Sequence, residues 1–244
     1  MIFAASGQRG VSMRVLVIEN FGGTGLGQVG RALREADAEI DYLRPETGDN
    51  LPTDSSKYDA LVVLGGGQNA LDDEGSPWFP ALMDLIRDFE RRDRAVLGVC
   101  LGAQLLARTF GGENHIGGHR EFGWHGITLN DGAAGDPVFT TLPSEFPIFQ
   151  WHDDSFSLPP EAVGLASSKA IENQAFRIGR AVYGTQFHFE ADTALVVEWS
   201  ATFADWLAQR EPDWPQRHPE QARLYGPAAD AVGLTLARAW VAAI

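Results

Sequence analysis

Short apolar runs alternate with amphipathic stretches through the first half of the chain. Most of the apolar runs are rich in Val, Ile and Leu, which is typical of strands that are buried on both faces. The predicted strands are 14–18, 38–43, 58–64 and 95–99. The stretches between them carry apolar residues at helical spacing, and the predicted helices are 29–36, 77–92 and 101–110. This alternation indicates parallel strands joined by right-handed crossovers.

The second half of the chain has a different pattern. Short runs separated by turn residues are typical of strands, some of them antiparallel. The predicted strands are 126–129, 148–151, 163–166, 175–178 and 181–187. From Ala191 the pattern becomes helical, with a proline-containing break at 211–219.

No linker or internal repeat divides the sequence. We therefore expect a single α/β domain over residues 13–244, preceded by a loose N-terminal extension over residues 1–12. Its fold class is a mostly parallel central sheet flanked by helices, with a small antiparallel sheet and a helical C-terminal tail.

Composition narrows the class of protein. The chain of 244 residues has 19 Lys and Arg against 33 Asp and Glu, a formal net charge of −14. A protein this acidic is a poor sequence-independent nucleic-acid binder, because phosphate contacts need a basic face. No apolar run is long enough for a membrane span, and the N-terminus lacks the pattern of a signal peptide. We expect a cytoplasmic protein with neither a nucleic-acid nor a membrane partner.

The strongest candidate chemistry surrounds the single cysteine. Cys100 stands between Gly98 and Gly102, in the form G-x-C-x-G, where a predicted strand meets a predicted helix. This is the cysteine version of a nucleophile elbow, whose sharp turn needs small neighbours and exposes the nucleophile. The turn places the sulfur at the N-terminus of the following helix, where the helix dipole favours a thiolate. A lone cysteine also excludes an intrachain disulfide.

A base and an oxyanion site are needed beside such a thiolate. His188 and Glu190 are two residues apart at the end of a strand-like run, so both side chains point to one side. Glu190 can then orient the imidazole of His188 toward the sulfur. Gly67, in the Gly65–Gly67 loop after a buried strand, and Leu101, after the nucleophile, are the expected oxyanion donors. H-x-E also opens the zinc deaminase signature, but one cysteine cannot supply the P-C-x-x-C part.

Together these motifs resemble the class I, triad-type glutamine amidotransferase domain over roughly residues 14–195. GVCLGAQLLA looks like its nucleophile elbow, GTQFHFE like its His-x-Glu motif, and LGGGQNALDD like its oxyanion loop, with Gln68 where proline is usual. The match is closest to the stand-alone group resembling the glutaminase half of GMP synthase. The resemblance implies a flavodoxin-like fold and a cysteine-dependent amidohydrolase that uses the triad Cys100, His188 and Glu190.

The resemblance also implies a substrate and its binding residues. Cys100 would attack glutamine or another γ-glutamyl compound, and ammonia would pass to an acceptor where a synthetase partner exists. A homodimer is equally compatible with the sequence. The resemblance implies that Gln104 binds substrate. It also implies that Glu121, Phe122 and Gly123 form a loop around the glutamine backbone, and that His152 and Asp154, in a W-H-x-D segment, lie near the same pocket.

Several alternatives stay open. Gly25, Gly27 and Gly30 form a G-x-G-x-x-G after a strand, and Asp41 lies near the position of a ribose-binding acid, which is typical of a dinucleotide site. That interpretation leaves the triad unexplained, and we expect no cofactor. A γ-glutamyl peptide or γ-glutamyl amine hydrolase would use the same triad. A non-catalytic binding or regulatory protein of this fold is the third alternative.

Two other groups of residues have no assigned chemistry. His115, His119 and His125 lie near Glu113 and Glu121, but their spacing fits no standard ligand pattern, so we expect no metal site. The tail carries four aromatic residues that either pack helices or face a partner. They are Trp199, Phe203, Trp206 and Trp214.

Overall fold

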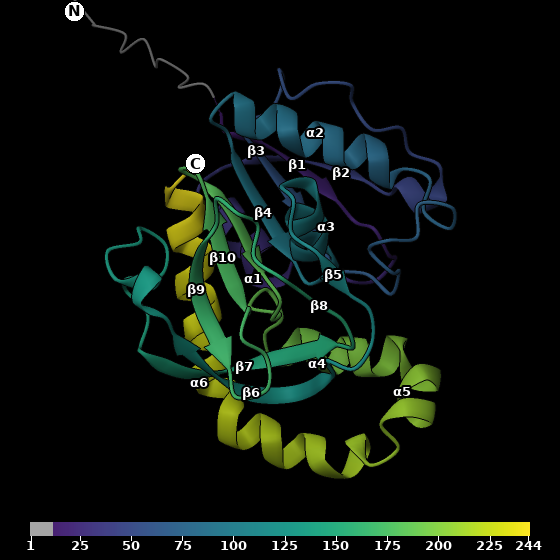
Figure 1. Cartoon of the computed structure of the whole chain (residues 1–244). Helices are drawn as coiled ribbons and strands as arrows, with labels where there is room; N and C mark the ends of the chain where they lie inside the picture. The colour runs from purple at the N-terminus through teal and green to yellow at the C-terminus, as the bar shows by residue number, and fades with distance from the viewer. Residues whose placement is uncertain (1–11) are drawn as a thin grey trace, which may run out of the picture.

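A nine-stranded sheet forms the centre of the protein in the computed structural model, which describes residues 12–244 (Figure 1). The strand order is β2-β1-β3-β4-β11-β10-β9-β6-β7. The extension expected over residues 1–12 lies outside the described residues except for Ser12. Within residues 12–244, no helix combines the length and the apolar character needed to cross a membrane.

Five neighbouring strands of the sheet are parallel. They are β1 (Arg14–Ile18), β2 (Glu39–Leu43), β3 (Ala60–Val63), β4 (Ala95–Val99) and β11 (Val182–Thr185). β1 and β3 are almost wholly buried, because helices cover both faces of the sheet. Alternate residues of β1 therefore enter two separate apolar clusters: Val15 and Val17 one, Leu16 and Ile18 the other.

Three helices follow these strands as the hydrophobic pattern predicts. They are α1 (Gly27–Glu35), α2 (Phe79–Arg91) and α3 (Leu101–Thr109). Helices α2 and α3 pack together on one face, and α1 packs with the C-terminal helix α6 (Trp214–Ala242) in the other cluster. Short 3₁₀ turns occur at Pro45–Thr47 and Asp131–Ala133. The expected α/β fold class is confirmed.

Antiparallel strands extend the same sheet beyond β11. They are β10 (Ala175–Ile178), β9 (Val163–Ser168), β6 (Glu121–Leu129) and β7 (Glu145–His152). The small separate sheet pairs β5 (Asn114–His115) with β8 (Ser155–Phe156). β6 begins five residues earlier than the sequence suggested, at Glu121 instead of Gly126. Gly123, with φ +98°, lies within this early part of the strand.

The C-terminal tail is helical, as expected. α4 (Thr193–Thr202) and α5 (Ala204–Arg210) precede the long α6. The predicted break at 211–219 is wrong in length, because only residues 211–213 are non-helical and Pro219 lies inside α6. A proline removes one intrahelical hydrogen bond, and burial of Trp214 and Trp240 against the sheet offsets that loss.

Candidate active site

Cys100 occupies a strained turn between β4 and α3. Its φ of 52° and ψ of −109° place a non-glycine residue in a region that costs backbone energy. A Cβ on Gly98 would stand 2.1 Å from Cδ1 of Leu106, and one on Gly102 only 2.0 Å from the carbonyl oxygen of Val63. Both glycines of the G-x-C-x-G motif are therefore required for α3 to pack against β3 and β4.

Parallel pairing brings the three functional segments to one edge of the sheet. β4 lies between β3 and β11, and all three end at this edge. The N–H of Cys100 donates to the carbonyl of Thr185 at 2.7 Å, which ties the elbow to the end of β11. The residues after β11 therefore reach back over Cys100, as expected for the carboxyl ends of strands in an open α/β sheet.

The imidazole of His188 is held by a buried carboxylate. Nδ1 of His188 lies 2.7 Å from Oε1 of Glu190, and both side chains are buried. Among the described residues Nε2 of His188 has no hydrogen-bond partner. A Cβ built on Gly65 would stand 3.3 Å from Cε1 of His188 and 3.5 Å from Cβ of Cys100, so the histidine and the cysteine are neighbours.

This environment favours the charged form of His188. Burial disfavours the imidazolium, but the negative charges of Glu190 and of Cys100 outweigh burial and raise the pKa of His188 to about 10. Cys100 is buried, and its sulfur lies 3.6 Å from Nε2 of Gln186, which donates to it. Together with the N-terminus of α3, these groups suit a thiolate–imidazolium pair.

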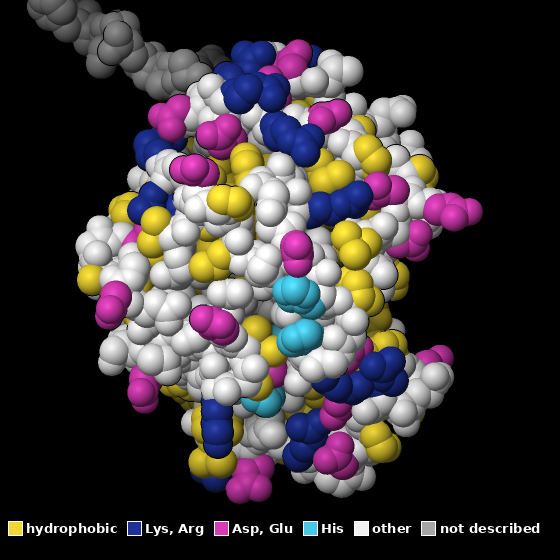
Figure 2. Space-filling view, in the orientation of Figure 1, with side chains coloured by type: hydrophobic (Ala, Val, Ile, Leu, Met, Phe, Trp, Pro, Cys, Tyr) yellow, Lys and Arg dark blue, Asp and Glu magenta, His cyan; other side chains and the backbone are white. Residues whose placement is uncertain are grey.

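A cavity of about 300 Å³ opens above the triad. Cys100, His188 and Glu190 form its floor, and the Gly65–Gly67 loop crosses one side. Its polar wall consists of Gln104, His152 and Asp154. Its aromatic wall consists of Phe21, Trp151, Trp199, Phe203 and Trp206. The surface is indented on the side that carries α5 (Figure 2).

The glycine loop is anchored at the position where the resemblance anticipates proline. Nε2 of Gln68 donates to the backbone carbonyl of Asn20 at 2.5 Å, which ties the loop to the segment after β1. Gly67 lines the cavity, and Leu101 begins α3, where the first N–H groups lack intrahelical acceptors. The backbone donors expected for an oxyanion therefore belong to segments that flank Cys100.

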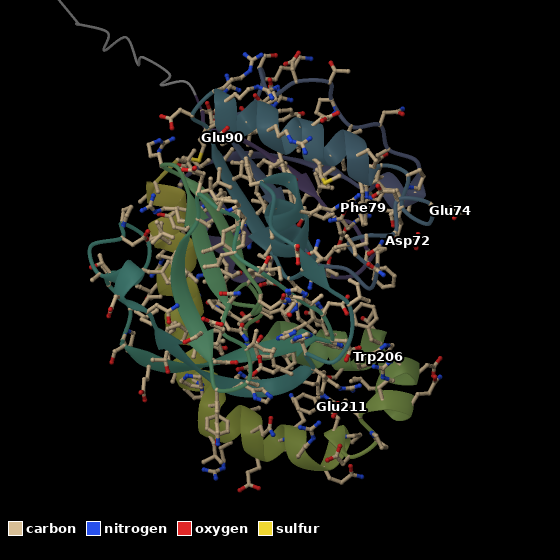
Figure 3. The ribbon with its side chains drawn as sticks, viewed as in Figure 1. Asp72, Glu74, Phe79, Glu90, Trp206 and Glu211 are labelled. Carbon is tan, nitrogen blue, oxygen red and sulfur yellow. The ribbon has the colours of Figure 1, made fainter. Side chains whose placement is uncertain are left out.

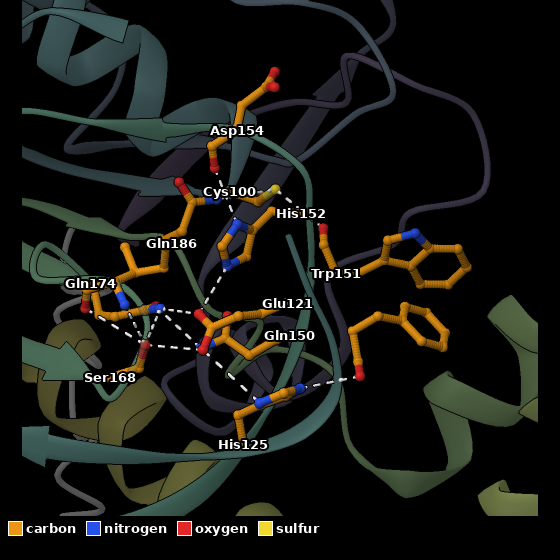
Figure 4. Close-up of polar contacts among 12 residues, drawn as sticks. Cys100, Glu121, His125, Gln150, Trp151, His152, Asp154, Ser168, Gln174 and Gln186 are labelled. Carbon is orange, nitrogen blue, oxygen red and sulfur yellow. Dashed lines mark hydrogen bonds and ion pairs between the residues drawn. The ribbon is translucent and has the colours of Figure 1, made fainter. Parts of the chain in front are cut away.

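Two chains of polar contacts lie near the sulfur, and Figure 4 shows the contact of Gln186 with Cys100 and the second chain through His152 and Glu121. In the first, Nε2 of Gln104 donates to Oε1 of Gln186 at 3.2 Å, and Gln186 contacts Cys100. In the second, Nδ1 of His152 lies 3.0 Å from the carbonyl of Asp154 and Nε2 lies 3.3 Å from Oε2 of Glu121. Contacts with buried residues thus fix the side chains of Gln104 and His152 in the polar wall.

Glu121 is the buried centre of the second chain. It accepts from the hydroxyl of Ser168 at 2.9 Å and from Nε2 of Gln174 at 2.5 Å. Burial acts to raise the pKa of Glu121, but hydrogen bonds from His152 and Ser168 overcome burial and lower that pKa below its usual value. The carboxylate therefore stays charged beneath the pocket.

The expectation that Glu121, Phe122 and Gly123 form a loop is wrong, because the structure places them on a strand. All three belong to β6, paired with Gln150–His152 of β7, and none lines the cavity. Phe122 packs 5.0 Å from Trp151 and 4.7 Å from Trp214 in ring-centroid distance. These residues support the pocket from behind. Gln104, His152 and Asp154 do line it.

Sequence reasoning missed the aromatic wall. Trp199 and Phe203 are four residues apart and Trp206 follows three residues later, a helical spacing that could have grouped them. In the structure Phe203 lies between α4 and α5. Trp206 lies on α5 near Glu211 at the margin of the molecule (Figure 3). The fourth tail aromatic, Trp214, is buried among Phe122, Trp124 and Phe149 instead.

The glycine motif at the start of α1 serves packing. A Cβ on Gly27 would stand 2.0 Å from the carbonyl oxygen of Glu190, and the N–H of Gln28 donates to that oxygen at 2.8 Å. Asp41, the candidate ribose ligand, is paired with Arg14 at 2.7 Å. The place where a dinucleotide phosphate would bind is therefore filled by the triad segment.

The histidines of the β5–β6 region do not converge on a common point with acidic groups. The rings of His115 and His119 lie 5.8 Å apart and are tilted by 35°, while Nδ1 of His125 lies 3.8 Å from Oε1 of Glu121. Within residues 12–244, no three His, Cys, Asp or Glu side chains are grouped so as to hold a metal ion.

Comparison with known proteins points to one family. The model "Glutamine amidotransferase class-I" matches residues 17–195, more than half of the chain. The glutamine amidotransferase-like protein YfeJ of Salmonella typhimurium is 32% identical over 154 residues, 62% of this chain and 64% of that protein. This chain therefore matches less than two thirds of YfeJ's length.

Two further similarities cover more of the chain. One subunit of the glutamine-hydrolysing GMP synthase of Thermoplasma acidophilum is 29% identical over 74% of this chain and 85% of that protein. The crystal structure of a glutamine amidotransferase from Thermotoga maritima superposes with a TM-score of 0.84 at 28% identity, over 95% of this chain and 97% of that chain. The similarity in fold thus includes the helical tail.

Proposed function

This chain belongs to the class-I glutamine amidotransferase family, and we propose that it cleaves the amide bond of glutamine or a related γ-glutamyl compound through a thioester on Cys100. The observation that carries this proposal is the strained Cys100 beside a His188–Glu190 pair of 2.7 Å at the floor of a cavity. A strained nucleophile with an oriented base is an arrangement for acyl transfer.

The first half of the reaction transfers the glutamyl group to sulfur. The Cys100 thiolate attacks the γ-carbonyl carbon, and the N–H groups of Gly67 and Leu101 stabilise the oxyanion. The imidazolium of His188 gives its proton to the departing nitrogen, and the C–N bond breaks as the carbonyl double bond re-forms, which leaves the new C–S bond in place. The products of this half are an amine or ammonia and the γ-glutamyl thioester.

The second half consumes water. Neutral His188 takes a proton from a water molecule, which attacks the thioester carbonyl, and the C–S bond breaks. Glutamate leaves, and the thiolate–imidazolium pair is restored. Glu190 does not touch the reacting atoms in either half; it is a positioning residue that fixes the tautomer and orientation of His188.

The similarity to the Thermoplasma GMP synthase protein favours one elaboration of this function. In that version ammonia from glutamine passes to a synthetase partner, and glutaminase activity is low until the partner binds. The chemistry at Cys100 is the same in both versions.

Intact-mass spectrometry after incubation with a glutamine-mimicking chloroketone tests the proposal. Wild type should gain one adduct, excess glutamine should slow its formation, and Cys100→Ala should gain none. Because Cys100 is the only cysteine, iodoacetamide serves as the control for simple thiol reactivity. Labelling that glutamine does not slow, or glutamate release that persists in Cys100→Ala, would contradict the proposed mechanism.

A further inference from the structure

We infer that the aromatic wall binds the leaving group of the substrate, so that the preferred donors are γ-glutamyl amides whose amine carries an aromatic or bulky apolar group. This inference rests on the proposed function. Free glutamine releases ammonia, which has no apolar surface to place against five aromatic side chains.

The position of His188 identifies the side on which the leaving group lies. His188 must give its proton to the departing nitrogen, so that nitrogen lies next to its imidazole. The same imidazole packs edge-on against Trp199 with ring centroids 5.1 Å apart. Trp199 in turn lies 6.0 Å from Trp151, which lies 5.7 Å from Phe203 and 5.2 Å from Trp206. The wall therefore continues outward from the proton donor.

The polar wall suits the glutamyl half of the same substrate. Gln104 is linked through Gln186 to the sulfur, and His152 and Asp154 line the same cavity. Figure 4 shows Trp151 on one side of Cys100 and Gln186 on the other. An amino acid head group needs polar partners, and an apolar amine does not, so the two walls match the two halves of a γ-glutamyl amide.

The aromatic wall is incompletely packed. Phe21 is 37% exposed, and Trp151, Phe203 and Trp206 are half-buried at the cavity. Large aromatic side chains that share an open cavity retain apolar surface that a ligand can cover. A ring placed there would be buried between Trp151 and the residues of α4 and α5.

Charges at the wall favour a neutral ring over a cationic amine. The guanidinium groups of Arg120 and Arg210 lie 5.5 and 5.4 Å from the Trp206 ring, so that ring already has two cations against it. Asp153 at the rim is paired with Arg210 at 2.8 Å, and Glu190 is paired with His188. The cavity's charged rim offers a polyamine little attraction.

Two dipeptides that differ only by a phenyl ring test the inference. For wild type, kcat/KM for γ-glutamylphenylalanine should exceed that for γ-glutamylalanine by roughly 10- to 100-fold, the range that apolar pockets achieve. Trp206→Ala should bring this ratio down to a few-fold. Tyr225→Ala removes an exposed aromatic residue of α6 outside the cavity and should leave the ratio as in wild type. A wild-type ratio near one, or below one, overturns the inference.

Binding to Cys100→Ala separates this inference from the proposed function. Calorimetry with both dipeptides measures the pocket without turnover, and γ-glutamylphenylalanine should bind roughly tenfold or more tightly. Preferential binding with no cleavage by wild type would reject the proposed function and keep the aromatic subsite. Equal binding, with Cys100-dependent cleavage of both dipeptides, would keep the function and reject the subsite.

Discussion

Glu190 influences the sulfur of Cys100 only through the imidazole of His188. Its carboxylate lies 2.7 Å from Nδ1, and burial prevents water from screening that charge. The raised pKa of His188, about 10, means that the imidazolium persists across neutral pH. Proton donation to the leaving nitrogen is then available until the pH approaches that value.

Glu190→Gln should alter the pH dependence as well as the rate. Removing the negative charge destabilises the imidazolium, so the pKa of His188 falls and the alkaline limb of the kcat/KM profile moves to lower pH. We expect kcat to drop by about 100-fold or more, because an amide can hold the wrong tautomer. Steady-state hydrolysis measured across neutral and alkaline pH would show both effects.

A matched carboxylate change supplies the control for that experiment. Glu74→Gln removes the same charge from an exposed loop position and should preserve the wild-type profile. If Glu190→Gln loses rate while its alkaline limb stays in place, then Glu190 does not hold the charge of His188, and its role would be only steric.

Local motifs explain which site residues could be predicted from the sequence. Cys100, with its two flanking glycines, and the H-x-E pair carry their signatures within a few neighbouring positions, and the structure brings the three together. Phe21 and Trp199 carry no such signature. They line the same cavity only because the sheet order brings the segment after β1 and α4 to the same edge, and no local pattern encodes that.

At the scale of elements, α1 and the segment after β11 are built against each other. The first position of α1 needs Gly27, with φ +43°, because the Glu190 carbonyl occupies the space of a Cβ. Nε2 of Gln28 also donates to the carbonyl of Phe189 at 3.2 Å. The start of α1 therefore helps to position the acidic member of the triad.

Gly27→Ala should disturb both folding and the triad. The new Cβ would meet backbone atoms at 2.0 Å, which cannot be relieved by a rotamer change. We expect a loss of stability above about 2 kcal/mol, since overpacking adds to the cost of positive φ. Urea unfolding and hydrolysis assays would measure the two effects.

Gly135→Ala separates the cost of the backbone angle from the clash. Gly135 has φ +80° with no atom within 4 Å of a built Cβ, so its change should cost about 1 kcal/mol and leave turnover intact. Equal effects of the two substitutions would show that Gly27 is required only for its dihedral angle.

Element boundaries followed the hydrophobic pattern where burial is uniform. Strands 14–18, 95–99 and 175–178 were predicted with the bounds that the structure has. The sequence does not predict the start of β6, because EFGWH begins and ends with polar residues. Glu121 is nevertheless buried, since Ser168 and Gln174 donate hydrogen bonds to its carboxylate. The two-residue strands β5 and β8 are too short for an alternation of apolar and polar residues to reveal them.

Across the whole molecule, the helical tail contributes to the pocket and also packs against the sheet. α5 is joined to the β6–β7 end of the sheet by the pairs Arg120–Glu211 at 2.5 Å and Arg210–Asp153 at 2.8 Å. α6 packs on α1 and on β7. A single Cβ on its Gly233 would meet the carbonyl of Phe189 at 2.4 Å, so α6 also touches the triad segment.

The family match ends at residue 195, but the fold does not end there. A chain cut after Leu195 would lose, among other buried side chains, the five largest: Trp199, Leu207, Trp214, Leu236 and Trp240. At roughly 2 kcal/mol for each, their burial is worth about 10 kcal/mol, comparable with the whole stability of a typical domain.

The truncated chain should therefore fail to fold cooperatively. Circular dichroism during thermal unfolding should show no sigmoidal transition, whereas a chain ending at Ala243 should melt within a few degrees of wild type. Ala243 is the appropriate limit because its carbonyl accepts from Arg180 at 2.7 Å. A cooperative transition in the chain cut after Leu195 would mean that the sheet, with helices α1–α3, is stable without the helical tail. In that case α4–α6 would serve the pocket, through Trp199, Phe203 and Trp206, and not the fold.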